Sequence, residues 1–201
     1  MKTIRLAFLI SILAIFVCSC SKTGVQDKFL LSDEMKNQNP FMGGEKLYYL
    51  TDSLEHIEFK VNERNNIIHE VPYGVRTNMW DLFENDKTFI SSDNNGSFLL
   101  DMRYIYGYFY EISYRFGTQS NSFTFKLPLN KNNTDHLDSL KVLEQWYYDV
   151  FISEYDTTDI FVSKGDTIED YAYKLYYSTQ SGIIKLDFLD DKSWQLEKIE
   201  W

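Results

Sequence analysis

The sequence predicts an all-β fold, and three of its properties support that prediction. Aromatic residues make up 17% of the 201 residues, and aromatic side chains favour strands. Apolar and polar residues alternate over short stretches, which is the pattern of strands with one buried face. Asn, Asp and Gly residues that favour turns separate these stretches. Together these features predict an antiparallel β-sandwich or a partly open β-barrel of about nine short strands.

The expected strands follow one another from residue 46 onward. Residues 47–50 form the first, and the alternation of Ile57 and Phe59 with charged residues marks the second. Residues 62–66 are all Asn, Glu or Arg, so we expect a turn there, after which 67–71 pairs back. Residues 88–90 are a further strand candidate. The remaining expected strands are 97–104, 107–116, 121–127, 145–153, 171–177, 182–189 and 193–199.

Residues 137–150 fit two patterns. One stripe of a helix would contain Leu137, Leu140, Leu143 and Tyr147. Tyr148 and Val150 belong instead to an alternation that is typical of a strand. A strand over 145–153 is favoured, and an α+β fold with a helix near 137–150 is the alternative.

The C-terminal segment predicts a hairpin whose inner face can be assigned. The even-numbered residues of 182–189 are apolar after the initial Gly, so this face is expected to line the core. Trp194 and Leu196 share one face of the following strand, whereas Ile199 has the opposite parity. The change of parity predicts a β-bulge near 197–198, and it assigns Trp194 to the core.

The first twenty residues have the form of a bacterial lipoprotein signal. Lys2 and Arg5 precede a largely apolar run over residues 6–17, which is shorter than the about 20 residues that a membrane-spanning helix needs. The next residues, Val17-Cys18-Ser19-Cys20, resemble the lipobox of bacterial lipoproteins. This resemblance implies that Cys20 becomes the N-terminus and carries the lipid chains.

We therefore expect three segments. Residues 1–19 are a signal peptide, residues 20–45 are a lipidated N-terminus with a flexible tether, and residues 46–201 are a single β-rich domain. The chain has two Cys residues, and cleavage before Cys20 would leave no second thiol for a disulfide. The hydrophobic core must then supply the stability of the domain.

Two further segments resemble small β-rich outer-membrane lipoproteins of unknown function from Gram-negative bacteria. One is 44–50, and the other extends over 176–178, 182–186 and 194–196. The resemblance implies a β-rich fold and a lipid anchor in the cell outer membrane, and it leaves open whether the protein faces the periplasm or the surface. It supplies no catalytic residue that could be carried over to this chain.

No sequence feature identifies a reaction. The net charge of −10 argues against a nucleic-acid partner, because phosphate binding needs basic patches. The three His residues lack metal-ligand spacing and a GxSxG motif is missing, so no catalytic, metal or cofactor residue is assigned. We expect a lipid-anchored cell-envelope protein that is a non-catalytic binding or structural module. The alternative is an envelope hydrolase that acts on glycan or peptide.

Two kinds of candidate site remain. Trp80 and Trp146 are candidate platforms for stacking against a glycan. Asp followed by Ser or Thr occurs in a pattern that resembles an O-glycosylation sequence of some Gram-negative secreted proteins. The expected partners are the membrane, through the lipid at Cys20, and an envelope protein or glycan. The candidate O-glycosylation residues are Ser53, Ser139, Thr157 and Thr167.

Metabolic labelling with a clickable fatty acid tests the lipid anchor. The wild-type chain is expected to incorporate the label and Cys20→Ala is expected to lose it, because the acylated thiol is removed. Cys18→Ala is the matched control and is expected to label as the wild type does. Equal labelling of the wild type and Cys20→Ala would contradict the anchor.

Overall fold

The computed structural model describes residues 24–73, 79–104, 108–115, 122–127, 135–154 and 171–201. These residues form twelve strands and one four-residue helix, α2 (Asp33–Lys36), so the all-β prediction is confirmed. They divide into two compact units. Unit 1 comprises the described residues up to Leu30 together with those from Ile68 to Phe83, and unit 2 comprises the rest. This division differs from the expected boundary at residue 46.

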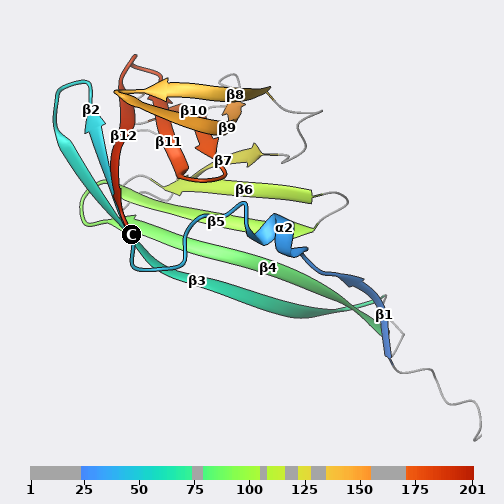
Figure 1. The fold of residues 1–201 in the computed structure, drawn as a ribbon. Helices are drawn as coiled ribbons and strands as arrows, with labels where there is room; N and C mark the ends of the chain where they lie inside the picture. Colours follow the sequence, from blue (N-terminus) through green and yellow to red (C-terminus); the bar gives the residue numbers. More distant parts are fainter. Residues whose placement is uncertain (1–23, 74–78, 105–107, 116–121, 128–134, 155–170) are drawn as a thin grey trace, which may run out of the picture. The chain divides into compact units, whose positions relative to one another are not determined.

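Unit 2 is built on a long antiparallel ladder (Figure 1). Its strands are paired in the order β7-β6-β5-β4-β3-β2-β12-β11-β10-β9-β8, which places the C-terminal strand between β2 and β11. The bounds are β2 (Lys46–Thr51), β3 (His56–Pro72), β4 (Met79–Ser92), β5 (Gly96–Tyr104), β6 (Tyr108–Arg115), β7 (Ser122–Leu127), β8 (Asp135–Val142), β9 (Gln145–Glu154), β10 (Ala172–Ser178), β11 (Gly182–Phe188) and β12 (Ser193–Glu200).

The two ends of this ladder approach each other. Ser153 on β9 donates a hydrogen bond from its hydroxyl to the carbonyl of Lys126 on β7, at 3.1 Å. The Tyr147 hydroxyl of β9 also donates a hydrogen bond to the carbonyl of Leu196 on β12, at 3.2 Å. Because β7 is the first strand of the ladder and β9 is next to the last, unit 2 is a sheet rolled onto itself around its core.

Aromatic side chains dominate the core. Phe59 is fully buried and its ring lies 5.8 Å from that of Tyr49, 5.1 Å from that of Phe98 and 5.8 Å from that of Trp194. The Tyr49 hydroxyl donates to the carbonyl of Ile183 at 2.8 Å, which satisfies its polar group inside the core. Burial raises the pKa of Tyr49 far above its ordinary value, so this hydroxyl remains a donor.

The C-terminal hairpin largely confirms the predicted faces. Leu186 and Phe188 are buried, and Trp194 is only 7% exposed. The register between β12 and β2 shifts between Leu196 and Lys198, where the sequence predicts a bulge. Ile183 is buried as well, although its parity predicts exposure. A second register shift, opposite residues 176–177 of β10, turns this residue inward.

The turn expected over residues 62–66 is wrong, because β3 continues without interruption to Pro72. The polar side chains that favour a turn find partners on the neighbouring strand β4 instead. The pairs are Asn62 with Ser91 at 2.7 Å, Arg64 with Asp86, and Asn66 with Glu84 at 2.6 Å.

The helix considered near 137–150 is also wrong, and the strand expected over 145–153 is confirmed as β9. Strands β8 and β9 form a hairpin in which Val142 faces Gln145. The two-residue connection contains Leu143 in the left-handed region, at φ 53°. Leu140 and Tyr147, which lie on the same helical stripe, become direct cross-strand partners. The hairpin therefore joins the apolar residues that suggested a helix.

Residues 31–45, expected to be part of a flexible tether, are packed within unit 2, and we call them the strap. The strap begins with helix α2, whose N-cap residue Ser32 accepts a hydrogen bond from the amide of Met35 at 3.2 Å. Figure 1 shows α2 in front of β4 and β5, and the side-chain amide of Asn39 donates to the hydroxyl of Thr88 on β4 at 2.8 Å. The buried side chains of the strap are Leu31, Met35, Asn39, Phe41 and Glu45.

Arg64 of β3 holds the strap to the ladder. Its guanidinium donates to the carbonyls of Lys36 at 2.8 Å, Asn39 at 3.2 Å and Phe41 at 2.9 Å. It also donates from Nε to the buried carboxylate of Asp86 at 2.9 Å. One side chain thus fixes three successive parts of the strap, since the planar guanidinium presents several donors in a fixed geometry.

Unit 1 contains the end of β3, the beginning of β4 and a short strand, β1 (Gly24–Phe29). Strand β1 pairs in parallel with β4, and the pairing begins with Gly24 opposite Met79. The rings of Phe29 and Phe83 stack with 4.6 Å between their centroids. The amide of Tyr73 donates to the carbonyl of Met79 at 2.9 Å, which joins the end of β3 to the start of β4.

Gly182→Ala is expected to lower the free energy of unfolding by about 2–5 kcal/mol, combining left-handed strain with overpacking. Gly182 has φ +76°, and a Cβ there would lie 2.2 Å from the ring of the fully buried Phe41. The control is Gly44→Ala, whose φ is +103° but whose Cβ would meet nothing within 4 Å. Urea denaturation measures both. Equal losses in the two variants would contradict close packing of the strap on β11.

Candidate functional site

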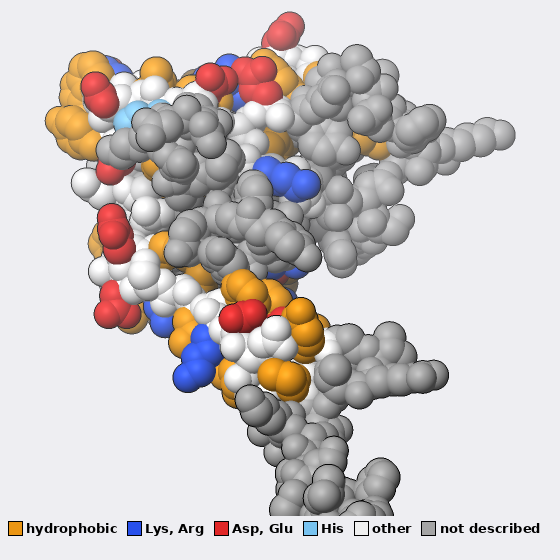
Figure 2. Space-filling model, turned by 90° about the vertical axis from the view of Figure 1, so that its right-hand side faces the viewer, with side chains coloured by type: hydrophobic (Ala, Val, Ile, Leu, Met, Phe, Trp, Pro, Cys, Tyr) orange, Lys and Arg blue, Asp and Glu red, His pale blue; other side chains and the backbone are white. Residues whose placement is uncertain are grey.

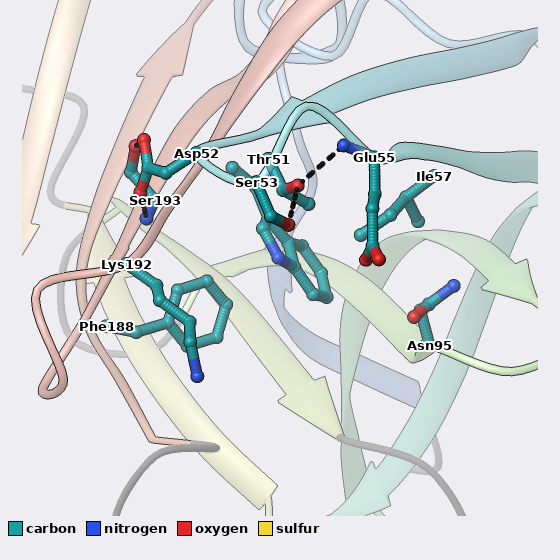
Figure 3. A pocket seen from close by; sticks show the side chains of 10 residues that line it. Thr51, Asp52, Ser53, Glu55, Ile57, Asn95, Phe188, Lys192 and Ser193 are labelled. Atoms are coloured by element: carbon teal, nitrogen blue, oxygen red, sulfur yellow. Dashed lines mark hydrogen bonds between the residues drawn. The ribbon is translucent and has the colours of Figure 1, made fainter.

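A pocket of about 510 Å³ opens on unit 2 where three chain turns meet (Figure 3). The turns are those between β2 and β3, between β4 and β5, and between β11 and β12. This volume lies within the range of small-molecule sites. The residues that line the pocket are Thr51, Asp52, Ser53, Glu55, Ile57, Asn95, Phe188, Lys192, Ser193 and Trp194.

The β2–β3 turn is held in a fixed shape that presents Glu55. The Thr51 hydroxyl accepts a hydrogen bond from the amide of Glu55 at 3.0 Å and lies 2.9 Å from the hydroxyl of Ser53. Leu54 adopts the left-handed region, with φ 63°, which allows the chain to reverse here. Figure 3 shows the carboxylate of Glu55 directed into the pocket. The local hydrogen bonds therefore orient a charged group toward the opening.

Asp52 connects the β2–β3 turn to the start of β12 through hydrogen bonds. One carboxylate oxygen accepts a hydrogen bond from the amide of Ser193, and the other accepts from the Ser193 hydroxyl at 3.0 Å. The same hydroxyl accepts a hydrogen bond from the side-chain amide of Gln195 at 3.1 Å. This network ties the β2–β3 turn to the start of β12, so both oxygens of Asp52 are engaged within the protein.

Lys192 supplies a positive charge on the side of the pocket formed by the β11–β12 turn. Its carbonyl accepts a hydrogen bond from the amide of Phe188 at 2.9 Å, and its ammonium group pairs with Asp190. The side chain is 60% exposed. Figure 3 shows it extending into the pocket from the side opposite Glu55. Asn95, from the β4–β5 turn, adds an amide that can both donate and accept hydrogen bonds.

Two aromatic residues form the apolar part of the lining. The rings of Phe188 and Trp194 lie 4.9 Å apart, and both residues are largely buried. The core position predicted for Trp194 is confirmed, but the residue also lines the pocket. An aromatic wall combined with polar groups of both charges can hold a small polar molecule that has an apolar face.

The His residues of the described ranges do not converge on this pocket. His56 pairs with Glu197 at 3.0 Å. His136 pairs with Asp149 at 3.2 Å and its ring packs on Phe151. None of the ten lining residues is a His. Within the described residues no group of three or more His, Cys, Asp or Glu side chains is placed to hold a metal ion.

The sequence candidates are distributed over different parts of the chain. Ser53 is exposed on the β2–β3 turn at the pocket, and Ser139 is half-buried on β8. Trp146 is 55% exposed on β9 in unit 2. Trp80 is half-buried in unit 1, where its partner on β1 is Val25. Cys20, Thr157 and Thr167 lie outside the described residues.

Sequence reasoning missed the pocket residues Glu55, Asn95 and Lys192. The signal available was that each belongs to a segment with turn chemistry, such as Asp93–Gly96 and Asp190–Lys192. Their convergence depends on strand pairing over long sequence distances, which a local pattern does not specify.

Comparisons with family models, with curated proteins and with solved structures find no match for this chain. In the part of the chain that the structure describes, no helix has both the length and the apolar character needed to cross a membrane.

Proposed function

We propose that this protein is a lipid-anchored protein of the cell outer membrane, and that its unit 2 is a non-catalytic module that binds a sugar unit of an envelope glycan. The leader sequence that ends immediately before Cys20 supports the anchor. The pocket supports binding, since it is a preformed hollow with an aromatic wall and polar groups at its rim.

We infer the chemical class of the ligand from the residues that line the pocket. A sugar presents an apolar face of C–H groups, which suits the rings of Phe188 and Trp194. Its hydroxyls both donate and accept hydrogen bonds, and the rim offers the carboxylate of Glu55, the amide of Asn95 and the ammonium of Lys192. Asn95 already donates to the hydroxyl of Ser92 at 3.3 Å and Lys192 already pairs with Asp190, so a sugar hydroxyl would add to these contacts, whereas a purely apolar ligand would offer no polar partner.

Glycan hydrolysis is the second candidate, because two carboxylates are among the lining residues. Glycosidases use a pair of carboxyl groups on either side of the scissile bond. In this pocket, however, both oxygens of Asp52 accept hydrogen bonds from Ser193. A carboxylate that fastens two turns together in this way is poorly suited to act as a nucleophile or base. Binding without turnover is therefore the favoured function.

Titration of the purified protein with glucose, galactose and the disaccharide of N-acetylglucosamine tests this proposal, with tryptophan fluorescence as the readout because Trp194 lines the pocket. At least one sugar is expected to give a saturable change. Asn95→Ala and Glu55→Gln are each expected to weaken that binding about 10-fold, since each removes a hydrogen bond.

Glu144→Gln is the matched control, because Glu144 has a side chain that is 96% exposed and lies outside the pocket lining. It is expected to bind as the wild type does. Failure of all three sugars to bind, or equal binding by every variant, would contradict a sugar site in this pocket. Release of reducing sugar from the disaccharide would favour the hydrolase instead.

A further inference from the structure

We propose that unit 1 lies on the surface of the lipid bilayer, in contact with zwitterionic lipid. We call its described residues the arm, which consists of residues 24–30, 68–73 and 79–83. This inference rests on the proposed lipid anchor at Cys20, and it goes beyond that anchor by assigning a membrane-contact surface to the folded chain.

The arm exposes apolar side chains that a soluble sheet would bury. In unit 2 the buried residues of β3 alternate with exposed ones up to Val61, but every residue from 65 to 72 is exposed. Figure 2 shows apolar side chains gathered in the lower part of the view, at the end of β3 and β4 that belongs to unit 1, with a few charged groups among them. The large apolar residues of unit 1 that are exposed by more than a third are Val25, Leu30, Ile68, Val71 and Tyr73.

The chain between the anchor and the arm is short, and this indicates that the bilayer covers the exposed apolar side chains of the arm. Strand β1 begins at Gly24, four residues after Cys20, and four residues span at most about 14 Å. The acylated thiol must lie at the lipid–water boundary because its chains enter the hydrocarbon. The start of β1 is thus confined to the vicinity of the headgroup region, whatever path the intervening residues take.

Strand pairing gathers the relevant side chains at the same end of the arm. Gly24 lies opposite Met79 and Val25 lies opposite Trp80. The amide of Tyr73 bonds the carbonyl of Met79, which brings the end of β3 to the same place. Tyr and Trp are the side chains that favour the boundary between lipid and water. The end of the arm nearest the anchor therefore carries residues suited to that boundary.

The charges of the arm argue for apolar rather than electrostatic attachment. In the sequence of unit 1 from residue 20 on, three basic residues balance three acidic ones, so no net charge draws it to anionic lipid. These residues are Lys22, Lys28 and Arg76 against Asp27, Glu70 and Asp81. Contact with zwitterionic lipid needs no such charge. Because the anchor already holds the arm close to the bilayer surface, even a weak apolar contact with lipid is formed most of the time.

The test uses the acylated full chain in phosphatidylcholine vesicles, with an environment-sensitive nitrobenzoxadiazole probe on an introduced thiol. Tyr73→Cys and Val71→Cys place the probe on the arm, at side chains whose exposure tolerates substitution. Glu144→Cys places it on the exposed β8–β9 turn of unit 2 as a reference. Mass spectrometry first verifies that Cys20 is acylated in every sample.

We expect the arm probes to emit at shorter wavelength in vesicles and to be quenched at least 2-fold by spin-labelled lipid, while the reference probe remains as in water. Water-like emission from both arm probes on an acylated chain would overturn the membrane contact and leave the anchor intact. A blue shift that spin-labelled lipid does not quench would also overturn it, in favour of a protein partner. Absence of the acyl group on Cys20 would overturn the anchor, and the membrane contact with it.

Discussion

The contact between Arg64 and Asp86 is the interaction on which unit 2 most depends. Asp86 is almost fully buried on β4, and a buried carboxylate is tolerated only when it is paired and hydrogen-bonded. Arg64 supplies that pairing and also donates to three carbonyls of the strap. The strap in turn places Phe41 against Gly182 of β11, and the Tyr177 hydroxyl of β10 donates to the carbonyl of Gln38 at 2.9 Å. A single guanidinium thereby connects opposite parts of the rolled sheet.

A second ionic contact secures the beginning of the strap. Burial alone would raise the pKa of Glu84, but hydrogen bonds from Lys36, Asn66 and the amide of Leu31 outweigh it and hold that pKa below the ordinary value. Because the pKa is lower in the folded state, this contact stabilises the fold at pH values above the pKa of an unfolded glutamic acid. The contribution disappears as the pH falls through the folded-state pKa. Acid is thus expected to loosen the strap at its N-terminal end.

The alternation of apolar and polar residues predicted the strands and their buried faces, because these depend on residues close in sequence. It did not predict features that depend on contacts between residues far apart in sequence. The buried faces of β11 and β12 and the bulge near Lys198 follow from side-chain parity. The Asn-rich stretch 62–66 has turn chemistry, but partners on β4 that lie about 20 to 30 residues away keep it extended. The strap was expected to be flexible because its buried side chains follow no regular period and its carbonyls are bonded by a distant residue, Arg64. The pocket was missed because three separate turns compose it.

Native-state hydrogen exchange of Arg64→Lys tests directly whether Arg64 holds the strap. Lysine retains the positive charge but cannot reach Asp86 and three carbonyls together. We predict that the amides of Phe41 and Gly44 exchange at least 10-fold faster than in the wild type. The amide of Leu186, which lies in the ladder between β10 and β12, is predicted to change much less. Unchanged exchange in the strap, or equal acceleration at all three amides, would contradict the account.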